Sequence, residues 1–362
     1  MIGPVVMADV FVIGGGPVGL AAAIAARRKG FRVALADGGE PCIDKACGEG
    51  LLPDGVAAAA ELGLQMPAAE SFALRGIRFH GEGVSVASEF PNGHGRGVRR
   101  TTLHRILAEE AERCGVDLRW NVPVTSLADI SSRWIVGADG IGSRVRAWAG
   151  LDDFVRDQRR YGFRRHFRAA PSSDYVEIYW GDGCQVYVTP VAADEVCIAL
   201  LSRDPKLRVN EALRQFPALL SRLEGAPESS TERGSLTASR KLRRVARGNV
   251  ALAGDASGSV DAITGEGLCL GFRQALALAD AMEAEDLRLY ERAHRRLARR
   301  PGFMADFMLT MDRSQWLRGR ALPALAAHPD LFGSLLAMHV GAGRTQTFAA
   351  TCLALGWKIL TI

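Results

Sequence analysis

Apolar runs alternate along the first part of the chain with glycine turns and a segment of helical composition. Residues 8–16 (ADVFVIGGG) form a short apolar run that ends in glycines, and residues 17–30 (PVGLAAAIAARRKG) follow with an Ala-rich sequence that ends in basic residues. Residues 31–37 (FRVALAD) form a second apolar run that closes on an acid. The order of strand, glycine turn, helix, strand and acid predicts a βαβ unit.

The pattern changes after the first 150 residues and later returns. Short apolar segments separated by turns are typical of antiparallel strands, and they occupy residues 161–169, 175–180, 184–191 and 195–203. A strand followed by glycines reappears at 248–258 and leads into a long helical segment. The remainder has helical character, and breaks are expected near Pro301, Pro323 and Pro329.

We therefore expect a mixed α/β fold, in which a Rossmann-like dinucleotide-binding domain is interleaved with an antiparallel β-sheet domain and is followed by a helical C-terminus. The expected boundaries are 7–150 and 240–285 for the discontinuous dinucleotide-binding domain, 65–98 and 151–239 for the substrate-binding sheet domain, and 286–362 for the helical region. Asp54 and Thr101 are expected to cap helices that begin beside them.

The composition narrows the classes of protein to which the chain can belong. It has 362 residues, 48% of them hydrophobic and 23% charged, which are ordinary values for a globular protein of about two domains. The net charge of +5 suits an anionic cofactor but does not indicate nucleic acid as a partner. We expect most of the Arg-rich runs to be solvated faces, with phosphate contact as the alternative for any one of them. Seven cysteines without a CxxC pair or a zinc-type Cys/His spacing predict free thiols, no metal site and a reducing compartment.

The two ends of the chain bear on its location. No signal-peptide pattern opens the sequence, and Met7 could be the natural start. No run reaches the ~20 apolar residues of a membrane-spanning helix. Residues 347–362 (TFAATCLALGWKILTI) are nevertheless apolar enough to contact a membrane or a protein partner. We expect a cytoplasmic protein whose C-terminal helices can make peripheral contact with a membrane.

The first glycine turn has the spacing of a dinucleotide-binding fingerprint. Gly14 would allow the tight turn, Gly16 would let the backbone approach a pyrophosphate, and Gly19 would let the helix pack closely on the strand. Pro17 opens the helix, whose N-terminal N–H groups favour phosphate. Asp37, at the end of the second strand, is placed to accept hydrogen bonds from ribose hydroxyls. This fingerprint fits NAD and FAD equally.

Two further segments decide between the two dinucleotides. Residues 136–146 (VGADGIGSRVR) and 251–268 (ALAGDASGSVDAITGEGL) resemble the paired DG and GD signatures of the FAD-dependent monooxygenase and geranylgeranyl reductase superfamily, the p-hydroxybenzoate hydroxylase-like flavoproteins. This resemblance implies non-covalently bound FAD, with NADPH or NADH as a transient reductant. It also implies that Asp139 lies near the FAD pyrophosphate, unless it only caps the next helix, and that Arg100, or else Arg99, contacts the phosphate or ribose side.

The GD segment is expected to hold the flavin end of the cofactor. By the same resemblance, Asp255, which follows Gly254, accepts a hydrogen bond from the ribityl chain. The backbone N–H groups from Gly265 through Gly267 to Leu268 are expected to face the N1–C2=O edge of the flavin, because a helix N-terminus stabilises the negative charge that develops there on reduction.

The segment KACGEGL, residues 45–51, resembles a loop of the geranylgeranyl reductase branch that lies beside the isoalloxazine. Cys47 is expected to pack near the flavin, with Gly48 letting the backbone approach a flat ring, although a direct redox or proton role for Cys47 remains an alternative. Glu49 is a candidate general acid or base or a loop hydrogen bonder, and Lys45 is a further catalytic candidate.

The expected sheet domain supplies the candidate substrate pocket, with Tyr179, Tyr187 and Pro190 as its residues. The segment YVTP falls where geranylgeranyl reductases have a Trp-x-Phe-Pro-like motif, of which only Tyr187 and Pro190 remain. This loss favours an NAD(P)H-dependent monooxygenase acting on a hydrophobic or aromatic small molecule, such as a polyketide or isoprenoid. A flavin-dependent reductase of carbon–carbon double bonds and a non-catalytic FAD- or lipid-binding scaffold are the alternatives.

Overall fold

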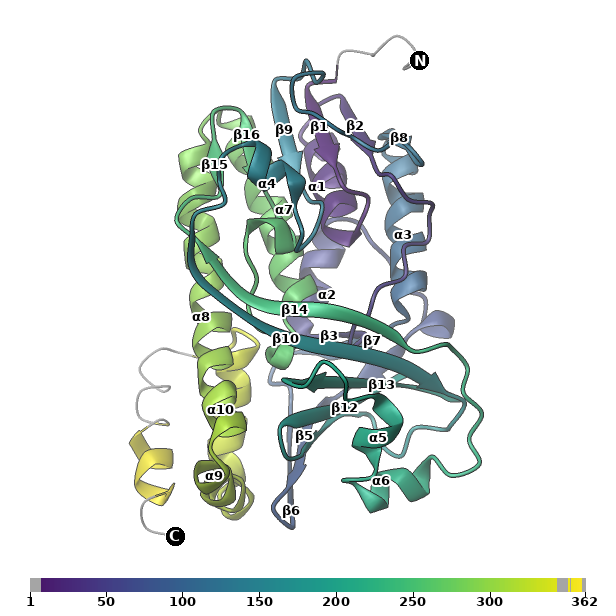
Figure 1. The fold of residues 1–362 in the computed structure, drawn as a ribbon, viewed down its shortest axis with the longest axis vertical. Coiled ribbons are helices and arrows are strands. Elements are labelled where there is room, and N and C mark those ends of the chain that lie inside the picture. Colours follow the sequence, from purple (N-terminus) through teal and green to yellow (C-terminus); the bar gives the residue numbers. More distant parts are fainter. Residues whose placement is uncertain (1–7, 344–350, 352, 360–362) are drawn as a thin grey trace.

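The computed structural model describes residues 8–343, 351 and 353–359 (Figure 1). Met7 and about half of the apolar C-terminal stretch lie outside the described residues. In the view of Figure 1 the N-terminal sheet and its helices form the upper part of the molecule and a second large sheet forms the lower part. Helix α8 (Leu287–Arg313) runs along the side of both.

The six-stranded sheet carries the predicted βαβ unit at its centre. Its order is β15-β16-β9-β1-β2-β8, and all neighbours are parallel except β15 and β16. All four residues of β1 are buried, as expected for a parallel strand that is covered on both faces. The strands are β1 (Val10–Ile13), β2 (Val33–Ala36), β8 (Asp117–Arg119), β9 (Trp134–Gly137), β15 (Ala246–Arg247) and β16 (Val250–Leu252).

Small residues let the helices approach this sheet and one another. A Cβ atom on Gly271 would lie 2.3 Å from a methyl carbon of Val18, so the two helices that carry these residues touch at a glycine. The helices of this part are α1 (Pro17–Arg28), α2 (Pro53–Glu61), α3 (Arg100–Arg113), α4 (Arg144–Trp148) and α7 (Gly267–Glu283), with short 3₁₀ turns η2 (Gly254–Ser257) and η3 (Ala262–Thr264) before α7.

Two expected helix caps are wrong. Helix α2 begins at Pro53 rather than after Asp54, and the Asp54 carboxylate accepts hydrogen bonds from Arg273 instead of from its own helix. Helix α3 begins at Arg100, one residue before Thr101, and its N-terminus has no side-chain cap. In both cases the helix begins two residues earlier than the capping preference predicts, because Pro53 is well suited to a first turn and Arg100 is held by a tertiary contact described below.

The second sheet has seven strands in the order β14-β10-β13-β12-β11-β5-β6. Its neighbours are antiparallel except β5 and β11, which pair in parallel and join the expected segments 65–98 and 151–239 in one sheet. The strands are β5 (Gly76–Gly81), β6 (Val84–Glu89), β10 (Phe154–Phe167), β11 (Tyr175–Trp180), β12 (Cys184–Ala192), β13 (Glu195–Ser202) and β14 (Arg233–Leu242). The mixed α/β class predicted from the sequence is confirmed.

Shorter elements connect the two large sheets. A three-stranded sheet consists of β3 (Gly50–Leu51), β7 (Gly95–Gly97) and β4 (Phe72–Leu74), and the turn η1 (Ala68–Glu70) precedes β4. Helices α5 (Val209–Leu213) and α6 (Pro217–Arg222) cover the outer face of the seven-stranded sheet, at the lower right of Figure 1.

Two arginines of the Arg-rich run on β10 are buried, although the sequence predicts that most such runs are solvated faces; Arg159 of the same run is exposed. Arg160 and Arg164 are buried on the inner side of the strand, where each meets a carboxylate. Arg160 lies 3.1 Å from Asp261, and Arg164 contacts Asp44. Two guanidinium groups buried in this way need carboxylate partners, since an unpaired buried charge is strongly destabilising.

The C-terminal helices pack against the seven-stranded sheet through a core that includes Leu322 and Phe332. Two of the three expected breaks are wrong: α8 continues through Pro301, and α9 (Gln315–Ala327) continues through Pro323. The third is correct, because α10 (Pro329–His339) begins at its proline. Among the described residues no single helix is long and apolar enough to cross a membrane, and α9 and α10 pass that test only together, bent by 105°.

Candidate functional site

A cavity of about 610 Å³ lies between the two large sheets. Its walls are the glycine turns at the carboxyl ends of the parallel strands, the loop that precedes β3, and the inner faces of β10 to β14. Most of the predicted site residues line it together: Gly14, Gly16, Pro17, Asp37, Lys45, Cys47, Gly48, Glu49, Arg100, Asp139, Tyr187, Gly254, Asp255, Gly265, Gly267 and Leu268. The volume lies within the usual range for ligand and cofactor sites.

The first glycine turn has the geometry that its spacing predicts. Gly14 has a φ of +108°, and a Cβ atom there would lie 2.5 Å from the carbonyl oxygen of Ala138. A Cβ on Gly19 would lie 1.8 Å from the oxygen of Gly14, so this glycine serves helix packing and does not line the cavity. Gly16 has no atom within 4 Å of its missing Cβ and faces the cavity. The turn therefore leaves room for a ligand at the N-terminus of α1.

Asp37 organises this turn through its own hydrogen bonds. One carboxylate oxygen accepts from the Gly15 N–H at 2.6 Å, and the other accepts from the Gly39 N–H at 2.7 Å. Each oxygen keeps lone-pair capacity for a further donor. Its contact with a ribose stays a prediction, and the structure adds a second role in fixing the glycine turn.

Asp139 caps the helix that follows it, which was the alternative to a purely cofactor-binding role. Its carboxylate accepts from the N–H groups of Arg144 and Val145, at 2.7 and 3.2 Å, and from the hydroxyl of Ser143 at 2.5 Å. Asp255, which follows the neighbouring parallel strand β16, lies 3.6 Å from the ammonium group of Lys45. This ion pair joins the GD segment to the loop before β3 at the cavity wall.

Helix α7 begins at the cavity wall. Cβ atoms on Gly265 and Gly267 would meet nothing within 4 Å, so the backbone at this helix N-terminus is open to a ligand. Glu266, between them, is buried and lies 3.4 Å from Arg300 and from the Nδ1 atom of His339. Burial raises the pKa of Glu266 to about 8, which keeps this carboxyl largely protonated at neutral pH.

The residues present fit FAD. Glycine backbone without a neighbouring side chain lines the cavity at Gly16, Gly48 and Gly267, which suits the pyrophosphate and a flat ring. The N-terminus of α1 offers N–H groups to phosphate. The Nε atom of Arg100 is buried at the cavity and has no hydrogen-bond partner among the described residues, so it is available to an anionic group.

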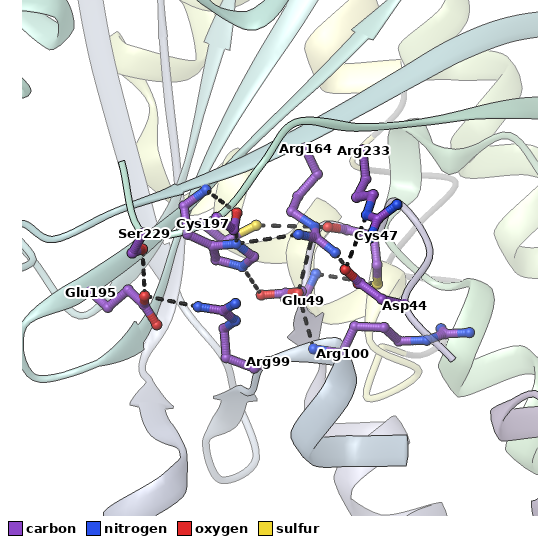
Figure 2. A network of polar contacts seen from close by, with 12 residues as sticks. Asp44, Cys47, Glu49, Arg99, Arg100, Arg164, Glu195, Cys197, Ser229 and Arg233 are labelled. Carbon is purple, nitrogen blue, oxygen red and sulfur yellow. Dashed lines mark hydrogen bonds and ion pairs between the residues drawn. The ribbon is translucent and has the colours of Figure 1, made fainter. Parts of the chain in front are cut away.

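The loop before β3 places the carboxyl group of Glu49 in the cavity wall. Figure 2 shows the polar contacts that this group makes. Glu49 is 2% exposed and has a φ of +58°, a conformation that L-residues rarely adopt. Its Oε1 atom accepts from the backbone N–H of Arg100 at 3.0 Å, and its Oε2 atom lies 2.6 Å from Nε2 of His166. These contacts explain both the early start of α3 and the unusual backbone of Glu49.

Cys47 is half-buried and lies at the cavity, as expected for a residue that shapes the pocket. Its sulfur accepts a hydrogen bond from the N–H of Glu49 at 3.4 Å, and its carbonyl oxygen accepts from the thiol of Cys197 at 3.7 Å. Burial raises the pKa of the Cys197 thiol well above its ordinary value. Whether Cys47 takes part in redox or proton chemistry stays a prediction.

Sequence reasoning missed His166 and Arg164. Both lie on the inner face of β10 together with Arg160 and Gly162, at alternate positions of one strand. Strict alternation from the glycine could have identified them, because successive residues of a strand point to opposite faces. Their partners Glu49 and Asp44 lie more than 100 residues earlier, and no local pattern connects the two segments.

Two of the three expected substrate-pocket residues are wrong. Tyr179 points to the outer face of the sheet, where its hydroxyl donates to Glu177 at 2.8 Å and its ring stacks on His80. Pro190 also does not line the cavity, whereas Tyr187 does and donates to the carbonyl of Ile263 at 2.7 Å. Strand alternation explains the difference, since odd positions of β12 and even positions of β11 face inward.

Comparisons with known proteins agree with this geometry. The profile of the FAD binding domain family matches residues 7–129 and 125–285. The chain is similar to a menaquinone reductase of Mycobacterium tuberculosis, with 29% identity over 317 residues that cover 77% of this chain and 78% of the relative. It is also similar to a digeranylgeranylglycerophospholipid reductase of Methanosarcina acetivorans, with 26% identity over 294 residues that cover 72% of this chain and 71% of the relative.

Solved structures share the fold. A flavoprotein/dehydrogenase from Cytophaga hutchinsonii superposes with a TM-score of 0.77 at 19% identity, covering 92% of both chains. A geranylgeranyl bacteriochlorophyll reductase-like protein from Thermoplasma acidophilum gives 0.72 at 17% identity over 98% of both chains. A 2-methyl-3-hydroxypyridine-5-carboxylic acid oxygenase gives 0.69 at 22% identity, covering 95% of this chain and 98% of that one. The resemblance predicted from the three glycine motifs is confirmed.

Proposed function

The chain belongs to the FAD binding domain family and is an FAD-dependent oxidoreductase, and from this premise we propose that it reduces carbon–carbon double bonds of a long apolar substrate. The observation that carries the proposal is the position of Glu49, a buried carboxyl group in the wall of the cavity that the dinucleotide-binding turns also line. Reduction of a double bond consumes a proton as well as a hydride, and this side chain is placed to supply a proton.

The relatives support a reductase over the monooxygenase that the degraded sheet motif had favoured. The names of the two relatives contain a quinone and a geranylgeranyl lipid, which are both large apolar molecules, and both name a reductase. The loop with Cys47 and Glu49 lines the same cavity as the dinucleotide-binding turns. The oxygenase neighbour shares the fold, which leaves oxygen chemistry as the second candidate.

The cavity wall formed by the seven-stranded sheet suits such a substrate. Ile77, Val176, Ile178 and Leu201 turn apolar side chains toward the cavity, and Tyr187 adds an aromatic face. Burying an apolar chain against such a wall contributes about 25 cal/mol per Å² removed from water. Recognition is therefore expected to depend mainly on apolar contact.

The chain's own residues would hold the cofactor and manage protons. Gly14, Gly16 and Arg100 would hold the phosphates, and the N-termini of α1 and α7 would favour negative charge on phosphate and ring. The bound flavin would supply a hydride that NADPH or NADH replenishes. Asp255 and Lys45 would fix the wall beside it through their ion pair.

Turnover without oxygen tests this proposal. The purified protein is incubated under argon with FAD, NADPH or NADH, and a quinone that carries an isoprenoid side chain. Because reduction of the quinone ring to the quinol also adds two hydrogen atoms, the ring is reoxidised before mass analysis. Two extra hydrogen atoms in the isoprenoid side chain then support the reductase. Oxygen consumption stoichiometric with product, and no turnover under argon, would replace it with the monooxygenase. A bound flavin that neither nicotinamide bleaches would favour the non-catalytic scaffold.

We also propose that the C-terminal part of the chain contacts a membrane surface peripherally. Trp316, Leu353 and Trp357 are exposed large apolar side chains, and the guanidinium of Arg320 lies over the Trp316 ring at 4.8 Å. Arg320 also donates to the carbonyl of Ile359 at 3.4 Å, which joins α9 to the last of the described residues. Aromatic and basic side chains together are typical of interfacial binding. Flotation with anionic vesicles tests this, and a Trp316→Ser, Leu353→Ser variant should remain in the lower fraction.

A further inference from the structure

We propose that Glu49, His166 and Ser230 form a relay that carries protons from the solvent to the cavity. The proposal deepens the double-bond reduction proposed above and rests on it for the use to which the proton is put. The three side chains come from the loop before β3, from β10 and from the segment before β14, so the tertiary fold alone brings them together.

The relay is continuous and crosses the sheet wall. The Oε2 atom of Glu49, in the cavity wall, lies 2.6 Å from Nε2 of His166. The Nδ1 atom of the same ring lies 2.8 Å from the hydroxyl oxygen of Ser230. His166 is fully buried, Ser230 is half-buried, and the next residue, Thr231, is exposed. The chain of contacts therefore leads from the cavity to the protein surface.

The neighbouring donors determine where the hydrogens lie. The Ser230 oxygen already accepts from the backbone N–H of His166 at 3.1 Å, which leaves its own hydrogen to donate to Nδ1. Arg164 places an N–H group 3.4 Å from the same Nδ1 atom, and a guanidinium can only donate. Nδ1 must therefore be the acceptor, so the ring proton sits on Nε2 and points at Glu49.

Contacts to the Oε1 atom fix the orientation of the Glu49 carboxyl group, as Figure 2 shows. The backbone N–H of Arg100 donates to Oε1 at 3.0 Å, and the guanidinium of Arg164 lies 3.8 Å from the same oxygen. Oε1 faces these two donors while Oε2 faces the histidine. The carboxyl group is therefore oriented with one oxygen committed to structure and the other to proton exchange.

A metal ion is the alternative occupant of this cluster, because Cys197 completes a set of donor atoms within 4.8 Å of one another. The 2.6 Å contact between Glu49 and His166 argues against it. Ligand atoms on a tetrahedral zinc ion, at ~2.0–2.1 Å from the metal, are separated by about 3.3 Å. The observed contact is that of a shared hydrogen, and the nearby Arg164 guanidinium opposes a cation.

The proton balance follows from this arrangement. The Glu49 carboxylate first takes the Nε2 proton of His166, while Nδ1 takes the hydroxyl proton of Ser230 and water returns a proton to the Ser230 oxygen. The Oε2–H bond of Glu49 then breaks as a C–H bond forms on the substrate, which restores the carboxylate. The Nε2–H tautomer of His166 re-forms by exchange of the ring protons with water before the next turnover. The hydride and its nicotinamide source are those of the proposed reduction.

The decisive measurement is the exchange of the His166 Nε2 proton with water, observed by NMR on protein with ¹⁵N-labelled histidine and bound FAD. His166 has no exposed surface, so rapid exchange needs the relay. We expect the Nε2–H tautomer and exchange that slows at least about ten-fold in Ser230→Ala. Ser229→Ala is the matched control, because that hydroxyl donates to Glu195 instead and should leave exchange unchanged. An Nδ1–H tautomer, or equal exchange in Ser230→Ala and wild type, would overturn the relay.

Kinetics separate a failed relay from a failed function. If the wild type reduces double bonds, Glu49→Gln should slow product formation by roughly 100-fold, while flavin reduction by the nicotinamide keeps its rate. His166→Gln should shift the pH dependence of product formation and keep FAD bound. Variants that turn over at wild-type rates with the wild-type pH profile would overturn the relay while the reductase stands. A wild type without reductase activity overturns the function, and proton exchange then decides the relay by itself.

Discussion

Replacing Glu266 with glutamine should remove a specific part of the pH dependence of stability. Glu266 and His339 face each other through two atoms that lack partners among the described residues, Oε2 and Nδ1, only 3.4 Å apart. The other nitrogen of His339 lies 3.1 Å from the carbonyl oxygen of Thr264 and must donate to it, so Nδ1 carries no hydrogen. A proton on Glu266 would satisfy both atoms, and a carboxylate there would leave two acceptors facing each other.

The direction of the pH effect on stability follows from the direction in which the pKa of Glu266 is shifted. Burial raises the pKa of Glu266 from its usual 4.5 to about 8, with Arg300 opposing the shift. Between these pH values the folded chain holds a proton that the unfolded chain has released. The contribution to stability is complete below about pH 4.5 and is lost as the pH rises through about 8. The slope is about 1.4 kcal/mol per pH unit, which gives roughly 5 kcal/mol over the interval.

His339 makes the free energy of unfolding depend on pH in the opposite direction. Burial lowers its pKa from 6.5 to about 4, so the folded chain keeps it neutral where the unfolded chain is protonated. Stability from this group is complete above about pH 6.5 and is lost as the pH falls through about 4. At acidic pH the contributions of Glu266 and His339 to stability change in opposite directions. The loss of stability caused by deprotonation of Glu266 should therefore appear most clearly between about pH 6.5 and 8.

Urea unfolding of the FAD-loaded protein at several pH values measures this difference. Glutamine has nearly the same shape as a protonated carboxyl group and can donate to the His339 nitrogen, so Glu266→Gln should match the wild type near pH 5. Its free energy of unfolding should then exceed that of the wild type increasingly up to about pH 8. Parallel stability curves for the two proteins across this range would refute the reasoning.

Three further substitutions test other parts of the structure. Gly16→Ala should leave folding intact, because the added Cβ atom enters open cavity space, and it should weaken FAD binding by about ten-fold or more in a fluorescence titration. The control variant Gly302→Ala, in α8, should bind FAD normally. Equal FAD affinities of the two variants would contradict this. Arg160→Met should lower the free energy of unfolding in urea by about 3–5 kcal/mol, since it leaves Asp261 buried without its partner, and a change below experimental error would contradict this. Tyr187→Phe should cost about 1–3 kcal/mol in thermal unfolding by leaving a buried carbonyl without its donor, which an unchanged melting temperature would disprove.

The parts that sequence reasoning predicted correctly are local. The turn at Gly14, the open backbone at Gly16 and the close packing at Gly19 depend on a few neighbouring residues, so their spacing alone predicts their geometry. The same holds for the N-terminus of α7, where a glycine pair marks the start of the helix. The conformation of each of these motifs is determined by the few residues of the motif itself.

The parts that it missed depend on partners far away in the chain. Arg160 occurs in a run of basic residues that is typical of a solvated surface, and only its distant partner Asp261 explains its burial. His166 has no neighbour in sequence that suggests Glu49, which lies 117 residues earlier. Tyr179 and Tyr187 belong to adjacent strands, and the side of the sheet that each faces follows from strand register, which a single sequence does not reveal.

The interleaved topology has a consequence for synthesis on the ribosome. Strand β1 receives one neighbour, β9, only after Gly137 is made, and the sheet is extended by β16 only after Leu252. At a translation rate of ~5–20 residues per second, roughly 10–50 s pass between the synthesis of β1 and the synthesis of β16. The growing polypeptide therefore carries an incomplete parallel sheet through most of translation. Its apolar strand edges are the natural target of any chaperone that attends this protein, and slowing translation between these strands should lower the yield of soluble product.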